Sequence, residues 1–319
     1  MISTHCTPKA ASACNRGRIA SLRLAAIILG GLLGYHAAAD VTMNTEMQTK
    51  LLKEAASPAS DMSDRRQALA QLGDTRDNTI VAPLKALLAR PRPPHEEIEN
   101  WDPVGAERVI DLHIIRTLHR LGDDSEIHRI ATLVGQAHST LQGPDDELNN
   151  CVATLLEVGQ MEPLKEIVSL TSTQDPLAVR NAVVVLDRLA LPEPPTGQDL
   201  ADLTKGVSPL TFTITRLSEE LEAIASNSQG LVALSPSVKT WVTSHDYERG
   251  KVQRSGMPLS EILSRDIRLL GFDYYVEGKQ IVVCTVAEAG ARWRSWWPDH
   301  YSKLEYDRME RRFVARNRQ

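Results

Sequence analysis

Aromatic residues are scarce in this sequence of 319 residues, at 4% of the chain, and cysteine occurs only four times. No two cysteines form a C-x-x-C pair, so thioredoxin-like redox chemistry has no support. The G-x-S-x-G, H-E-x-x-H, P-loop and G-x-G-x-x-G motifs are also missing, so no motif indicates a serine hydrolase, a zinc protease or a nucleotide-binding enzyme. We therefore expect a protein that binds partners and needs no cofactor, metal or catalytic residues.

Acidic residues are absent from the first 39 positions, which carry four basic residues. After the last of these, Arg23, an uncharged run covers 24–39 and ends in Ala37-Ala38-Ala39. The run is shorter than the roughly 20 residues of a membrane-spanning helix, and its small final residues suit a signal peptidase. We expect 1–39 to be a cleavable signal peptide and the mature protein to be periplasmic. An uncleaved inner-membrane anchor is the alternative.

An excess of basic residues is lacking as well. The chain carries a net charge of −5, and removal of the basic leader makes the mature protein more acidic. Such a protein has no general electrostatic attraction to nucleic acid. We expect no nucleic-acid partner.

The cysteines divide between the leader and the mature chain. Cys6 and Cys14 belong to the leader, whereas Cys151 and Cys284 lie in apolar patterns. Free cysteine is commonly buried, so we expect two buried thiols. A disulfide between them stays open as an alternative, because the periplasm is oxidising.

An apolar pattern repeats between residues 60 and 190. L-x-x-L-G-D occurs at 69–74 and 118–123, a related form occurs at 155–160, and a fourth copy at 186–189 lacks the glycine. Apolar residues three and four positions apart form one helical stripe. A glycine after the stripe favours a left-handed helix end, and the acid that follows favours the start of the next helix.

This pattern resembles HEAT repeats, particularly the short HEAT-like type, over residues 40–195. The resemblance implies stacked helix pairs that form an α-helical solenoid with a curved docking surface. A proline-rich segment at 90–103 interrupts the first two copies and carries Trp101. This segment is either an ordered connection or a binding loop, with Trp101 as its candidate partner-binding residue.

After the prolines at 192–195 the pattern changes to that of a small α+β module. We expect strands at 211–216 and 231–238, and a helix at 217–228. A second amphipathic helix is expected between Pro258 and Gly271, followed by a hairpin of 272–276 and 280–283 around Gly278.

The module resembles the short N-terminal domain (STN) of secretins and TonB-dependent receptors, over residues 207–287. The matching positions are Leu217, Leu221, Ile224, Ala225, Gly256, Leu259, Leu263, Leu269, Leu270, Phe272, Tyr274, Gly278 and 281–283. The resemblance implies a periplasmic domain that contacts envelope proteins and carries no catalytic residues. The segment 239–251 lengthens the middle of the module, and here the module follows helical repeats instead of opening a long chain.

The tail, 288–319, is rich in tryptophan and charge. We expect its last 17 residues to form a charged helix with Tyr306, Met309 and Phe313 on one face. Three uses of the tail stay open: packing back onto the protein, docking of a partner, and contact with a membrane surface. The partner-binding candidates in it are Trp293, Trp296, Trp297 and Tyr301.

Together these patterns predict a mixed fold, with a HEAT-like α-helical solenoid followed by a small STN-like α+β domain. His113 and His119 would lie about 240° apart around a helix, which does not favour a metal site. We expect an exported, non-catalytic adaptor of the bacterial cell envelope, linked to a secretin or TonB-type system. The alternative is a periplasmic enzyme or ligand-binding protein that uses the groove between the two domains.

Overall fold

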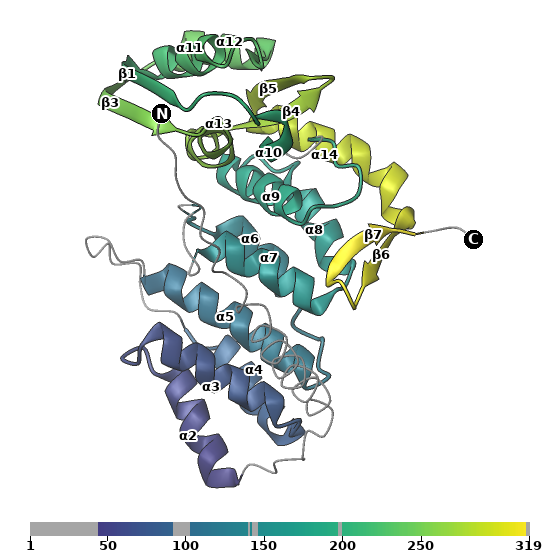
Figure 1. Cartoon of the computed structure of the whole chain (residues 1–319). Coiled ribbons are helices and arrows are strands. Elements are labelled where there is room, and N and C mark those ends of the chain that lie inside the picture. The colour runs from purple at the N-terminus through teal and green to yellow at the C-terminus, as the bar shows by residue number, and fades with distance from the viewer. Residues whose placement is uncertain (1–43, 92–102, 140, 142–145, 197–199, 317–319) are drawn as a thin grey trace, which may run out of the picture. The chain divides into compact units, whose positions relative to one another are not determined.

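A computed structural model describes residues 44–91, 103–139, 141, 146–196 and 200–316 (Figure 1). From Thr45 onward the chain forms one compact unit. A helical first half is followed by a region with small sheets, which confirms the predicted mixed fold class. The predicted signal peptide and Trp101 lie outside the described residues.

The helical part is built from helices that pack in two rows. α3, α5, α7 and α9 follow one another in the first row, α2 precedes them, and α6 and α8 pack together in the second row. The first leucine of each pattern copy is buried at no more than 1% exposure (Leu69, Leu118, Leu155, Leu186). The elements are α2 Thr45–Ala56, α3 Met62–Asp74, the 3-10 helix η2 Asn78–Ile80, α4 Val81–Leu88, α5 Pro103–Arg120, α6 Arg129–Gln136, α7 Glu147–Val158, α8 Glu162–Leu170 and α9 Pro176–Arg188.

The glycine of the pattern plays two different roles. Gly122 and Gly159 adopt left-handed φ values of 84° and 65°, as predicted for helix ends. The prediction is wrong for Gly73, which lies inside α3. A Cβ at Gly73 would come within 3.1 Å of the Arg120 side chain, so glycine there permits the close approach of α5.

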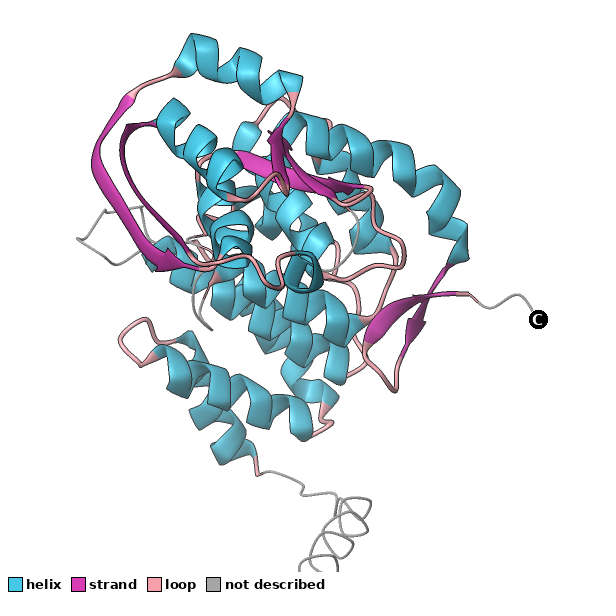
Figure 2. Cartoon of the chain, turned by 45° about the horizontal axis from the view of Figure 1, so that its top comes forward, coloured by secondary structure: helices cyan, strands magenta, loops and turns pink. Residues whose placement is uncertain are grey.

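The α+β region has two separate small sheets, visible in Figure 2. β1 pairs with β3 antiparallel, and β5 lies between β2 (parallel) and β4 (antiparallel). The elements are α10 Leu200–Leu203, β1 Leu210–Arg216, α11 Leu217–Asn227, β2 Val232–Leu234, α12 Pro236–His245, β3 Glu248–Met257, α13 Leu259–Glu261, the π-helix η3 Ile262–Ile267, β4 Phe272–Glu277 and β5 Gln280–Thr285.

Most of the predicted elements of this region are present. The strand at 211–216, the helix at 217–228 and the hairpin around Gly278 are confirmed. The strand predicted at 231–238 stops at Leu234, because Ser235 caps a helix that has Pro236 in its first turn. Strand β3 was not predicted. Its sequence is largely polar, and in the structure it pairs with β1 in a two-stranded sheet.

The chain after β5 completes the helical part. α14 (Val286–His300) packs against α9 and also contacts α8. The fourth pattern copy contains α9 alone, so its second helix is supplied by α14 from beyond the α+β region. The region 200–285 is therefore inserted between two paired helices (Figure 1).

The charged helix predicted for the last 17 residues is wrong. After the 3-10 helix η4 (Tyr301–Lys303), strands β6 (Leu304–Asp307) and β7 (Arg312–Ala315) form an antiparallel hairpin. Tyr306 faces Phe313 across it, with ring centroids 5.2 Å apart. Apolar and charged residues alternate in β6, which suits a strand with one buried face.

Candidate functional site

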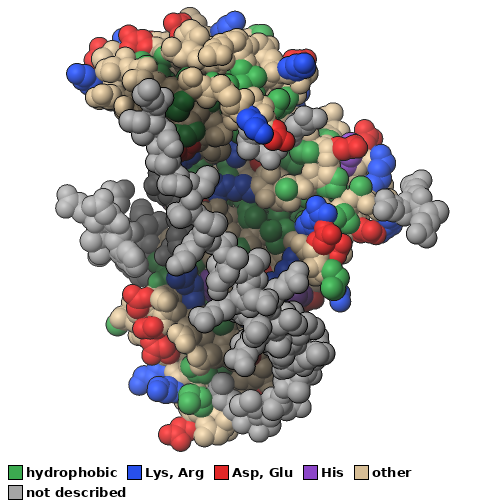
Figure 3. Space-filling model, viewed as in Figure 1, with side chains coloured by type: hydrophobic (Ala, Val, Ile, Leu, Met, Phe, Trp, Pro, Cys, Tyr) green, Lys and Arg blue, Asp and Glu red, His purple; other side chains and the backbone are tan. Residues whose placement is uncertain are grey.

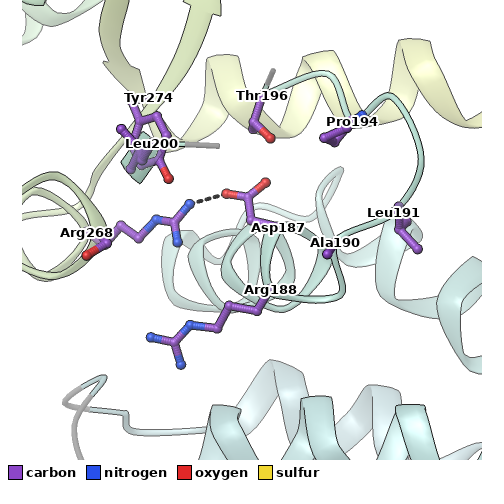
Figure 4. A pocket seen from close by; sticks show the side chains of 10 residues that line it. Asp187, Arg188, Ala190, Leu191, Pro194, Thr196, Leu200, Arg268 and Tyr274 are labelled. Carbon is purple, nitrogen blue, oxygen red and sulfur yellow. Dashed lines mark hydrogen bonds and ion pairs between the residues drawn. The ribbon is translucent and has the colours of Figure 1, made fainter. Parts of the chain in front are cut away.

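A cavity of about 600 Å³ lies where the end of α9 meets the α+β region. The apolar part of its lining comes from Ala190, Leu191, Pro194 and Leu200. The polar groups come from Asp187, Arg188, Thr196, Ser264, Arg268 and Tyr274. Figure 4 shows the guanidinium of Arg268 pointing at the Asp187 carboxylate, whereas Arg188 extends away from Asp187.

Arg268 connects the α+β region to α9. Its side chain is 4% exposed and forms an ion pair with Asp187 through Nη2. Its Nε donates to Oδ1 of Asp273 at 3.0 Å. Trp293 of α14 donates from Nε1 to Oδ1 of Asp187 at 3.1 Å. One carboxylate thus joins α9, α14 and the α+β region.

The electrostatics of this cluster are those of two carboxylates around one guanidinium. Burial raises the pKa of Asp187 well above its usual range, and the charge of Asp273 raises it further. Each oxygen of Asp187 already accepts a hydrogen bond, from Trp293 and from Arg268. The cluster is thereby arranged as a buried clamp, in which removal of one partner leaves an uncompensated charge.

Arg188 is the second basic group of the cavity. Its Nη1 donates to Oδ1 of Asn149 on α7, and no described carboxylate lies within ion-pair distance of it. Burial lowers the pKa of Arg188, and the charge of Arg268 lowers it further. Figure 3 shows basic side chains between the α+β region at the top and the helices beneath it.

The tryptophans of the tail lie in the interior. Trp293 is 0% exposed, and Trp296 and Trp297 are each 8% exposed. Trp296 donates from Nε1 to the carbonyl of Glu193 at 2.6 Å. Packing onto the protein is therefore the arrangement that the structure has, and these indoles offer no exposed docking strip. Tyr301 is half-buried, with its ring centroid 5.0 Å from that of Trp297.

The terminal hairpin is fixed to α7. Tyr306 donates its hydroxyl hydrogen bond to the carbonyl of Leu156. Its ring lies against Gly159, where a Cβ would collide with it. Glycine at this position thus serves both the left-handed helix end and the docking of the hairpin.

The histidines and cysteines are separate from the cavity. The described residues contain no group of three or more His, Cys, Asp or Glu side chains that could hold a metal ion. Burial, together with the charges of Arg116 and Arg66, lowers the pKa of His113 to about 3. Cys151 and Cys284 are buried and free, as predicted, and burial raises the pKa of both thiols.

No sequence pattern marked the residues that line the cavity. Asp187 gave one signal, because with Arg188 it interrupts an apolar run from Val183 to Leu191 in the fourth copy of the pattern. A buried acid requires a charged or hydrogen-bonding partner. Its partner, Arg268, is 81 residues away, and no sequence spacing indicates that contact.

No protein-family model, curated protein or solved structure matches the chain. Over the residues that the structure describes, no helix has the length and apolar character needed to cross a membrane.

Proposed function

We propose that the protein is an exported, non-catalytic adaptor of the bacterial cell envelope. The basic, acid-free leader followed by small residues supports export. The likeness of the repeats to HEAT repeats supports a docking scaffold, and the likeness of 207–287 to STN domains supports contact with a secretin or TonB-type system. Both halves thus resemble domains that bind other proteins.

The observation that carries the proposal is the insertion of the α+β region between α9 and α14. A module at the end of a flexible linker would reorient freely. Here both of its ends join paired helices, and the buried Arg268–Asp187 ion pair fixes it from within. The arrangement suits a scaffold that presents one binding module in a defined orientation.

The module has two exposed large apolar side chains that a partner could cover. Tyr247 is 48% exposed and Leu269 is 43% exposed. Tyrosine is enriched among residues that dominate binding energy at interfaces. These two positions are therefore the first places to probe for an envelope partner.

Site-specific photo-crosslinking in the native cells tests the adaptor proposal. A photoreactive residue replaces Tyr247 or Leu269, and the matched control replaces Glu222, which is exposed on α11. We expect one envelope protein to crosslink from Tyr247 or Leu269 and not from Glu222. Absence of any crosslinked protein from both positions would overturn the proposal.

Export has its own test. The mass of the chain purified from native cells should correspond to a protein that begins at Asp40. A full-length chain recovered from the membrane fraction would instead establish the uncleaved anchor.

The cavity favours a second candidate function, that of a ligand-binding protein. A volume of about 600 Å³ falls within the range of about 300–1,000 Å³ of small-molecule sites. A lining that combines apolar side chains with polar groups is also typical of such sites. Binding of a small molecule to the purified mature chain, measured by isothermal titration calorimetry, tests this function independently of any protein partner.

A further inference from the structure

We propose that the cavity at the end of α9 binds a small carboxylate with an apolar body, and that Arg188 is the ionic partner of the carboxylate. This inference rests on the second candidate function and names its ligand class.

The first support is the charge balance around the cavity. The positive charge of Arg268 is compensated by Asp187 and Asp273, which both contact its guanidinium. Arg188 has the neutral Asn149 as its hydrogen-bond partner and no described carboxylate within ion-pair distance. Partial burial removes water from the guanidinium, which costs free energy when no anion is beside it. A carboxylate that binds there would offset this cost.

A third arginine adds to the positive potential. Arg180 lies two turns earlier on α9 and donates from Nη2 to the carbonyl of Ser139 at 3.1 Å. Its Nε is buried and has no hydrogen-bond partner among the described residues. Burial lowers the pKa of Arg180, the charge of Asp146 raises it, and the charges of Arg268 and Arg188 lower it further. Of these three arginines, Arg268 alone forms an ion pair with carboxylates within the part of the chain that the structure describes.

The same balance indicates the charge of the ligand. Arg188 forms no ion pair with a carboxylate of the described residues, and one carboxylate from a ligand would supply that pair. A dianion such as a phosphate monoester would place a second negative charge near the buried Asp187. The planar guanidinium also matches the two oxygens of a carboxylate.

The apolar residues of the lining indicate the rest of the ligand. The segment after α9 carries Ala190 and Glu193, both with φ of 49°, a backbone conformation that residues other than glycine rarely adopt. Trp296 holds this segment by donating to the carbonyl of Glu193. Strained backbone that is held by its surroundings is frequent at ligand sites. Here it places Leu191 and Pro194 in the wall of the cavity.

Comparing the affinity of an acid with that of its amide measures how much the negative charge contributes to binding. Isothermal titration calorimetry of the mature chain compares 4-methylpentanoate with 4-methylpentanamide, which has nearly the same shape and no charge. A second pair, acetyl-Ala-Leu with a free or an amidated C-terminus, asks whether the carboxylate belongs to a free acid or to a peptide end. We expect at least tenfold tighter binding of the acid than of the amide in one pair.

The variant Arg188→Met tests the assigned residue, and Arg116→Met is its matched control. Arg116 is also half-buried and also donates to α7, from Nε to the hydroxyl of Thr154 at 2.9 Å, but it does not line the cavity. We expect Arg188→Met to weaken binding of the acid at least tenfold and Arg116→Met to leave it unchanged. The comparison of acid with amide on the unaltered chain stands even if a variant fails to fold.

Three outcomes would overturn the inference: equal binding of acid and amide, binding of neither, or unchanged binding of the acid by a folded Arg188→Met protein. If the acid and the amide bound equally, the protein would still bind a small molecule, but the carboxylate would not be what it recognises. A failed crosslinking experiment would remove the adaptor while leaving the carboxylate site intact.

Discussion

Trp293 donates its indole hydrogen bond to Asp187 at 3.1 Å, across 106 residues of sequence. The contact joins α14 to α9, and between these two helices the chain forms the whole α+β region. The two helices of this pair are therefore brought together across the whole inserted region. Contacts between residues so distant in sequence are entropically costly to close, so we expect them to form late in folding.

Replacing Trp293 with phenylalanine should reveal the hydrogen bond. Trp293→Phe keeps an apolar ring in a site that is 0% exposed, but it removes a donor from the buried Asp187. We expect a loss of unfolding free energy of about 1–3 kcal/mol. Urea denaturation measures it. Trp297→Phe is the control, because Trp297 is also buried and its indole makes no hydrogen bond to a described residue. Equal losses in the two variants would contradict a specific role of the bond.

The Arg268 clamp makes a second prediction. Arg268→Met leaves Asp187 and Asp273 without their shared cation in a buried site. We expect a loss of about 3–5 kcal/mol, the usual consequence of breaking a buried ion pair from one side. Adding Asp187→Leu should restore part of this stability, because the uncompensated acid is removed. Additive losses in the double variant, measured by urea denaturation, would show that the two residues are not coupled.

Gly159 allows a third test, with Gly122 as a matched control. Both glycines have left-handed φ, but a Cβ at Gly159 would collide with the Tyr306 ring, whereas nothing lies within 4 Å of one at Gly122. We expect Gly159→Ala to destabilise the protein more than Gly122→Ala, which loses about 1–2 kcal/mol from backbone strain alone. Tyr306→Ala should remove most of the difference. Equal melting temperatures for the two alanine variants would show that the hairpin does not dock as described.

The sequence predicted those parts of the fold that depend on residues close together in the chain, and not those that depend on residues far apart. The apolar stripes that contain Leu69 and Leu118 each predicted a helix, because apolar periodicity is a local signal. The packing of α14 on α9 left no local signal. The terminal hairpin was misread because Tyr306 and Phe313 are seven residues apart, a spacing that suits one face of a helix, while their pairing across two strands depends on a turn between them. The cavity left no local signal either, because Arg268 and Asp187 lie 81 residues apart in the sequence and meet only in the folded protein.

His113 predicts the response of stability to acid. Burial lowers its pKa in the folded protein to about 3, below its ordinary value of 6.5. Between these values the unfolded chain binds a proton that the folded protein does not, so acidification favours unfolding. The stability that comes from keeping this ring neutral is complete above pH 6.5 and is lost as the pH falls toward 3.

The expected slope is about 1.4 kcal/mol per pH unit, so a fall from pH 7 to pH 5 should lower the unfolding free energy by about 2 kcal/mol through this group. His113→Gln removes the titrating ring, and its stability should therefore decrease less than that of the unaltered protein over this range. Above pH 6.5 the two profiles should run parallel, which provides the internal control. Urea denaturation at half-unit pH steps makes the comparison, and profiles that stay parallel down to pH 5 would show that His113 accepts a proton as readily in the folded protein as in the unfolded chain.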